Sequence, residues 1–202
     1  MNIHRFKKYD HLIIAIACFL VCLFCLSKMS FAETTISTKY HLECNTFKSG
    51  YELKIETIQH FKPIAIRVYA DMSNRKKNHA KTGYTWGYGV QGRWYHNNMY
   101  AGIGYGWHGY NSKFSDHKKW EKKAGQPNYA IGFESEITDI ALIYHPNEHM
   151  TINEVSAVAV NIKIHITKNV LTIYDIQRSS YDQDETRHHD LQSSVGIGWR
   201  FI

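Results

Sequence analysis

The chain has 202 residues and a formal net charge of +6, but residues 1–32 hold four of the basic residues and one acidic residue. The remaining residues, about 170 in number, carry 20 basic against 17 acidic side chains, a net charge of +3. This excess is too small to indicate a nucleic-acid-binding protein. The length suits one domain over residues 33–202.

The N-terminus has the three parts of a secretory signal peptide. Arg5, Lys7 and Lys8 precede an apolar run from Leu12 to Leu26, and Ser30-Phe31-Ala32 gives a small-x-small ending. We therefore predict a Sec-type signal peptide over residues 1–32, cleaved after Ala32. The alternative is an uncleaved anchor, although the run is shorter than the ~18–20 apolar residues that a spanning helix needs.

Period-two alternation of apolar and polar residues dominates the rest of the chain, and helical periodicity is nearly absent. This pattern predicts an all-β fold of about ten strands. The fold would have eight strands if two of these predicted strands are absent or merge with their neighbours. The predicted strands cover residues 37–46, 51–59, 64–73, 84–95, 99–110, 128–137, 140–145, 154–167, 170–177 and 191–202.

The connections between these strands alternate in length. Short ones lie at 60–63, 96–98, 138–139 and 168–169, whereas long polar ones lie at 74–83, 111–127, 146–153 and 178–189. The first hairpin, around 48–50, departs from this rule. Short turns at one end and long loops at the other are typical of an outer-membrane barrel. We therefore predict a closed antiparallel transmembrane β-barrel of eight or ten strands.

Alternation alone does not distinguish this barrel from a soluble sandwich, whose apolar face points inward. Glycines on the polar side of the strands at 84–95 and 99–110 favour a crowded polar interior. Tyr84 and Trp94 lie on one face ten residues apart, or about 25 Å along a tilted barrel, which is the height of the apolar band. The predicted lipid-interface aromatic residues are Tyr84, Trp86, Trp94, Trp107, Trp199 and Phe201.

Charges on the polar side nearly balance, which favours a lumen closed by ion pairs because buried charges persist only when they are paired. Glu52 and Glu56 belong to this inward set. The predicted ion-pair network also contains Lys54, Arg67, Asp71, Arg93, Glu134, Glu136, Lys163, Asp175 and Arg200.

Three of the four cysteines lie in the predicted signal peptide, which leaves Cys44 with no intramolecular disulfide partner. Cys44 shares the parity of Tyr40 and Leu42. We therefore predict that it faces lipid as a small apolar side chain.

The C-terminal sequence SSVGIGWRFI alternates Val195, Ile197, Trp199 and Phe201 with glycine and arginine. It resembles the last strand of small Gram-negative outer-membrane barrels of the OmpX/Ail and opacity-protein type. That resemblance implies a location in the outer membrane and recognition of the terminal strand by the barrel-assembly machinery. In this sequence Ile202 follows the aromatic residue.

Clustered lysines in two long loops suggest a binding role. Their partners would be phosphates of lipopolysaccharide, or sulfated glycans or proteins of a host surface. The alternative is a pair of solvated loops that balance the charge of the surrounding lipid. The predicted ligand-binding residues are Arg75, Lys76, Lys77, Lys113, Lys118, Lys119, Trp120, Lys122 and Lys123.

Two other functional classes stay open. One is a lipid A-modifying enzyme of the PagL or PagP type. A deacylase of this kind would need a serine activated by histidine, and the candidate is Ser73 with His79 or His108. A narrow pore is disfavoured because tyrosines and Arg93 point into the lumen. We predict no cofactor and no metal site, because His188-His189 and His145/His149 lack the spacing of a zinc motif.

Overall fold

The computed structural model describes residues 32–44, 47–76, 78–113, 119–146, 154–183 and 186–201. The chain divides into the units Met1–Ala32 and Glu33–Ile202, and the barrel occupies the second. The predicted signal peptide up to residue 31 lies outside the described residues. Among the described residues, no helix has the length and hydropathy to cross a bilayer.

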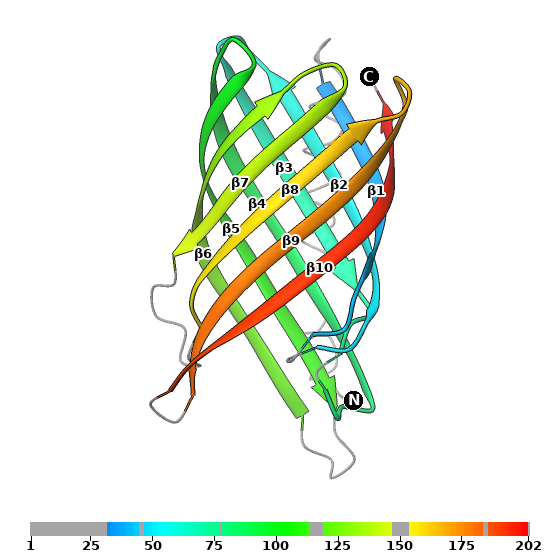
Figure 1. Cartoon of the computed structure of the whole chain (residues 1–202), viewed down its shortest axis with the longest axis vertical. Helices are drawn as coiled ribbons and strands as arrows, with labels where there is room; N and C mark the ends of the chain where they lie inside the picture. Colours follow the sequence, from blue (N-terminus) through cyan, green and yellow to red (C-terminus); the bar gives the residue numbers. More distant parts are fainter. Residues whose placement is uncertain are drawn as a thin grey trace, which may run out of the picture. The chain divides into compact units, whose positions relative to one another are not determined.

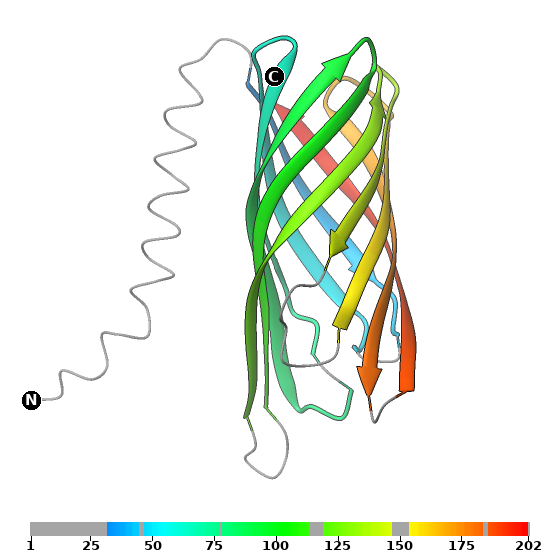
Figure 2. The ribbon, with the colours of Figure 1, turned by 90° about the vertical axis from the view of Figure 1, so that its left-hand side faces the viewer.

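Ten antiparallel strands form one closed barrel, in which each strand pairs with its neighbours in sequence and β1 pairs with β10 (Figures 1 and 2). The barrel therefore has ten strands and not eight. The strands are β1 (Ala32–His41), β2 (Gly50–His60), β3 (Ile64–Ser73), β4 (Thr82–His96), β5 (Met99–Lys113), β6 (Lys119–Glu134), β7 (Thr138–Pro146), β8 (Glu154–His165), β9 (Val170–Gln183) and β10 (Thr186–Phe201).

The connections at the two ends differ less in length than the sequence predicts, because β5, β6, β9 and β10 extend into the residues predicted as loops at 111–127 and 178–189. Short connections at 61–63, 97–98, 135–137 and 166–169 lie at the end that carries the C-terminus, uppermost in Figure 1. The opposite end carries the connections at 42–49 and 74–81 and the extended ends of the β5–β6 and β9–β10 pairs. We call these the short-turn end and the long-loop end.

The apolar face of each pleat points outward, and the polar face points into the lumen. Ile103 and Ile197 are 63% and 52% exposed, whereas Arg67 and Lys163 are 7% and 8% exposed. A water-soluble barrel would show the reverse. The chain therefore has the inside-out surface of a transmembrane barrel, in which closure also leaves no unpaired strand edge in the hydrocarbon.

Glycines give the lumen the room for its aromatic side chains. A Cβ added at Gly132 would lie 2.4 Å from Tyr100 Cζ, and one added at Gly106 would lie 2.4 Å from Tyr69 Oη. Real Cβ atoms do not approach so closely, so a larger residue at either position would displace a tyrosine ring. The rings thus fill the volume that the glycines leave open.

Most strands differ from their predicted bounds, and the largest differences are in β1, β6, β9 and β10. β6 begins at Lys119 instead of residue 128, and β10 begins at Thr186 instead of 191. These added segments pair with β5 and β9 although they lack apolar alternation, because a strand that extends past the membrane needs no lipid-facing side. β1 begins five residues earlier than predicted and ends at His41.

Cys44 corrects the parity prediction. It follows the end of β1, so the alternation of that strand does not apply to it, and it does not lie on the lipid-facing side of a strand. Its sulfur accepts hydrogen bonds from the backbone N of Phe47 at 3.3 Å and from Arg75 Nη2 at 3.5 Å.

Candidate functional site

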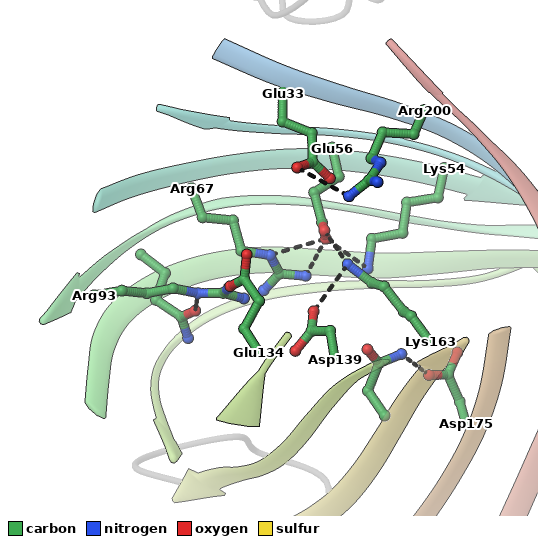
Figure 3. Close-up of polar contacts among 12 residues, drawn as sticks. Glu33, Lys54, Glu56, Arg67, Arg93, Glu134, Asp139, Lys163, Asp175 and Arg200 are labelled. Carbon is green, nitrogen blue, oxygen red and sulfur yellow. Dashed lines mark hydrogen bonds and ion pairs between the residues drawn. The ribbon is translucent and has the colours of Figure 1, made fainter. Parts of the chain in front are cut away.

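Glu56 on β2 is the centre of the largest ion-pair cluster in the described lumen (Figure 3). Its carboxylate accepts a hydrogen bond of 2.8 Å from Arg67 Nε and another from Arg67 Nη2. Lys163 Nζ binds the other carboxylate oxygen, and Lys54 Nζ lies 3.6 Å away. Three cations from β2, β3 and β8 therefore share one buried anion.

A second carboxylate, Asp139 on β7, supports this cluster. Strand register places Asp139 directly opposite Lys163 on β8, and the closest Nζ–O distance is 3.5 Å. Asp139 is 5% exposed. Because the sequence prediction treated residues 138–139 as a turn, it missed this member of the network.

A second cluster lies around Lys39 on β1. Lys39 Nζ is 2.7 Å from a carboxylate oxygen of Glu52 and 2.7 Å from one of Asp175. His41 Nε2 is 2.8 Å from the other oxygen of Glu52, and Ser194 donates a hydrogen bond of 3.2 Å to Asp175. These contacts join β1 to β2 and β9, and β10 to β9, near the seam where the barrel closes.

A third cluster surrounds Arg93 on β4. Its guanidinium lies 4.2 Å from the centre of the Tyr100 ring, and its Nε donates a hydrogen bond of 3.0 Å to Gln91. Glu134 lies 3.7 Å from Arg93 Nη1 and accepts a hydrogen bond of 2.7 Å from Tyr95. Arg93 is 4% exposed, so its charge is satisfied by protein groups.

The remaining residues of the predicted ion-pair network differ in whether they lie in the lumen. Arg200 pairs with Glu33 at 3.5 Å across the β1–β10 seam. Asp71 faces inward, where a Cβ added at Gly87 would lie 2.7 Å from it. Glu136 does not enter the lumen: it lies exposed in the connection between β6 and β7, because β6 ends at Glu134.

This lumen is a filled, charge-neutralising interior. Within the described residues, ion pairs and aromatic rings occupy it from the Arg93 cluster to the Lys39 cluster. Such an arrangement holds the strands together and fills much of the interior with side chains.

Arg75 is placed differently from the ligand-binding role predicted for it. It is 6% exposed, and its guanidinium donates to Gln192 Oε1 at 3.0 Å and to the backbone oxygen of Lys48 at 3.4 Å. It also lies 5.2 Å from the centre of the Phe47 ring. Burial lowers the pKa of Arg75, and the nearby Cys44 acts in the opposite direction. The side chain joins two connections instead of facing a ligand.

Three lysines of the connection 74–81 and of β5 lie at the long-loop end. Lys81 and Lys113 are exposed, and the backbone N of Lys81 donates a hydrogen bond of 2.8 Å to the oxygen of Lys113. Lys76 is half-buried, with its Nζ 2.9 Å from the backbone oxygen of Lys81. Residues 74–81 contain no acidic residue. We call Lys76, Lys81 and Lys113 the lysine rim.

The other predicted ligand-binding residues cannot be placed. Lys77 and Lys118 lie outside the described residues. At the start of β6 the structure describes the backbone but not the side chains of Lys119, Trp120, Lys122 and Lys123.

The predicted interface aromatic residues lie on the outer surface. Trp94, Trp199 and Phe201 are 56%, 51% and 49% exposed near the short-turn end. Tyr84 and Trp107 are 41% and 42% exposed toward the long-loop end, where Trp86 is partly exposed.

The candidate chemical groups from the sequence are also located. Ser73 is buried, and its Oγ accepts a hydrogen bond of 3.0 Å from the backbone N of Arg75. His79 lies in the connection that follows β3, with a φ of 65°. Among the described residues, no group of three or more His, Cys, Asp and Glu side chains is arranged to hold a metal ion.

Several solved structures are similar to the chain. The chain is similar to Neisserial surface protein A, with 10% identity, 84% of this chain and 95% of that chain covered, and a TM-score of 0.39. It is similar to the translocator domain of the autotransporter NalP from Neisseria meningitidis, with 8% identity, 95% and 98% coverage, and a TM-score of 0.45.

A third similar structure is Ail, the attachment invasion locus protein of Yersinia pestis, in complex with the heparin analogue sucrose octasulfate. It has 13% identity, 85% of this chain and 99% of that chain covered, and a TM-score of 0.37. No family model and no curated protein matches the chain. The fold is an outer-membrane type of β-barrel. The closed pairing of the strands and the outward-facing apolar surface identify this fold.

Proposed function

We propose that the protein resides in the outer membrane of a Gram-negative bacterium and binds anionic ligands at its long-loop end. The observation that carries this proposal is the lysine rim. Lys81 and Lys113 are exposed at the ends of β4 and β5, whereas the lumen cations around Glu56 and Lys39 already have carboxylate partners. The ligands are phosphates of lipopolysaccharide or sulfated glycans of a host surface.

The orientation follows from the connections. Outer-membrane barrels place their short turns in the periplasm and their long loops outside the cell. In this orientation the lysine rim faces the cell exterior, together with the predicted basic residues at 118–123. Export by the signal peptide and assembly through β10 belong to the same proposal.

Lysine suits this role because its ammonium group is a compact cation on a flexible stem. Each exposed lysine near an anionic surface contributes roughly 1 kcal/mol of binding free energy. Exposed charges are also screened over about 8–10 Å at moderate ionic strength. Binding at the lysine rim is therefore expected to weaken steeply as salt increases.

Changing Lys76, Lys81 and Lys113 together to Gln tests the proposal. The triple variant should bind immobilised heparin and purified lipopolysaccharide about tenfold to hundredfold more weakly, because it loses three cations. Its salt dependence should also be shallower. Changing Lys118, Lys119, Lys122 and Lys123 to Ser should weaken binding further.

The matched control changes Lys62 and Lys168 to Gln, because both are exposed at the short-turn end. This variant should bind as the wild type does. Folding of each variant is checked by its mobility on a gel before and after boiling. Unchanged binding by a folded lysine-rim variant would contradict the proposal.

One observation favours a second candidate, a lipid A-modifying hydrolase. Strand register places His145, Ala157, Ser179 and Asp190 in one inward row across β7 to β10. Serine, histidine and an acid are the residue types of an activated nucleophile. Ser179 Oγ accepts a hydrogen bond of 3.1 Å from Gln177.

Mass spectrometry of lipid A distinguishes the two candidates. Cells with and without the protein should give the same lipid A spectrum if its role is binding. Loss of an acyl chain in cells that have the protein, but not in cells with Ser179→Ala, would establish the hydrolase instead.

A further inference from the structure

An aromatic surface covers the outer side of β4 and β5 toward the long-loop end. Trp86 and Tyr88 are stacked with ring centres 5.7 Å apart, and Tyr88 stacks on Trp107 at 5.4 Å. Tyr105 meets Trp107 edge to face at 4.7 Å. We call Trp86, Tyr88, Tyr105 and Trp107 the aromatic panel.

The panel extends onto β6. A Cβ added at Gly125 would lie 2.7 Å from Tyr105 Oη and 2.8 Å from Trp107 Nε1. The two side chains therefore rest against the backbone of the next strand at a position where only glycine fits. The panel thus spans three strands, which is wider than a single row of interface residues.

The outer surface changes beyond β6. The exposed residues of β7 and β8 are mainly aliphatic, among them Leu142, Val158 and Ile164, with Tyr144 as the exposed aromatic residue. An aliphatic surface is sufficient for contact with the hydrocarbon tails of lipids. The aromatic panel therefore has a chemistry that contact with acyl chains alone does not explain.

The panel carries four polar tips, two indole N–H groups and two phenol O–H groups. Among the described residues, none of them has a protein hydrogen-bond partner, and Tyr88, Tyr105 and Trp107 are 40%, 41% and 42% exposed. A polar group without a partner in an apolar environment carries a substantial free-energy penalty. Carbonyl, hydroxyl or phosphate oxygens of a bound lipid would remove this penalty.

Cations lie directly beyond the panel on the same two strands. Thr82 pairs with Lys113, and Lys81 bonds to Lys113 through its backbone. Lys113 is exposed and has the same parity on β5 as Tyr105 and Trp107, with buried Gly109 and Asn111 between them. The outer side of β4 and β5 therefore carries aromatic rings with their hydrogen-bond donors, and positive charge where these strands end near the long loops.

We propose that the aromatic panel and the lysine rim together form a lateral docking site for a phosphorylated glycolipid of the surrounding leaflet. Acyl chains would lie on the rings, ester and sugar oxygens would accept hydrogen bonds from the four tips, and a phosphate would bind Lys81 and Lys113. This inference rests on the lysine rim of the proposed function and adds that the ligand is held from within the membrane.

The test changes Trp86 and Trp107 together to Leu, which keeps an apolar surface but removes two rings and two donors. Protein purified in mild detergent is mixed with lipopolysaccharide, and native mass spectrometry measures the bound glycolipid. Occupancy at a fixed concentration should fall about tenfold. Heparin, a soluble polyanion that does not enter the membrane, should bind as it does to the wild type.

The matched control changes Trp94 and Trp199 to Leu at the short-turn end and should retain the glycolipid. Equal retention by both double variants would overturn the docking site, whereas the proposed function would stand if the lysine-rim variant still lost heparin binding. Conversion of a dimer to a monomer by the panel variant, without loss of glycolipid, would also overturn it by identifying a second copy as the occupant.

Discussion

Glu56→Gln is expected to lower the unfolding free energy of the barrel by roughly 3–5 kcal/mol, because removing one partner of a buried ion pair leaves charges without compensation. The change keeps the shape of the side chain. It removes the anion that Arg67, Lys163 and Lys54 share in the lumen. Urea unfolding in detergent or lipid vesicles, followed by the gel mobility of folded and unfolded forms, measures the loss.

A double variant separates lost charge compensation from a general packing defect. Lys163→Met removes one of the stranded cations, so adding it to Glu56→Gln should recover part of the stability. Glu136→Gln is the matched control, because Glu136 is exposed in a short connection, and it should change little. Wild-type stability of Glu56→Gln would show that the cluster is open to water and screened.

Gly132→Ala is expected to destabilise the barrel by about 1–3 kcal/mol, the usual effect of adding a methyl group to a filled interior. The new Cβ would lie 2.4 Å from Tyr100 Cζ. Tyr100 cannot move freely, because its ring lies 5.3 Å from that of Tyr95 and 4.2 Å from the Arg93 guanidinium. The same unfolding measurement applies.

Gly92→Ala is the matched control. Gly92 is exposed on the outer side of β4, and the nearest heavy atom to an added Cβ is 3.9 Å away. In a Tyr100→Ala background, Gly132→Ala should become nearly neutral, because the clashing ring is gone. An equal loss of stability with and without the Tyr100 ring would show that backbone strain, and not the ring, is responsible.

The architecture could be predicted because one physical pattern repeats along the chain. Each membrane-spanning strand must present one face to lipid and the other to the lumen, so Ile64 to Ser73 alternates without exception and β3 has its predicted bounds. The alternation of short and long connections adds the orientation. Both signals are local in sequence, and neither depends on which strands meet at the seam.

Ion-pair partners could not be predicted in the same way, because they depend on register and on lumen diameter. Glu56 and Lys163 are 107 positions apart and meet across the interior. Asp139 and Lys39 were missed for local reasons: Asp139 was predicted to lie in a two-residue turn, and Lys39 lies in a strand whose start was predicted five residues too late. Knowing that a residue points inward does not identify the residue it meets.

Arg75 shows why ligand-binding residues in loops are difficult to predict from sequence. The loop sequence NRKKNHAK gives no sign that one of its cations turns toward Gln192 and Phe47 while Lys81 stays exposed. Side-chain direction in an irregular connection is set by tertiary contacts, and composition does not encode it. The aromatic panel, by contrast, follows from strand parity once β4 and β5 are aligned.

The seam between β1 and β10 has a consequence for how the protein is made. Glu33 and Arg200, which face each other there, are 167 positions apart, and Thr34 lies opposite Phe201. Contacts of such long sequence separation form slowly. β1 therefore keeps unpaired backbone hydrogen-bonding groups along one edge until it pairs with β10. During that interval the incomplete sheet has two unpaired edges, which are prone to pair with other chains.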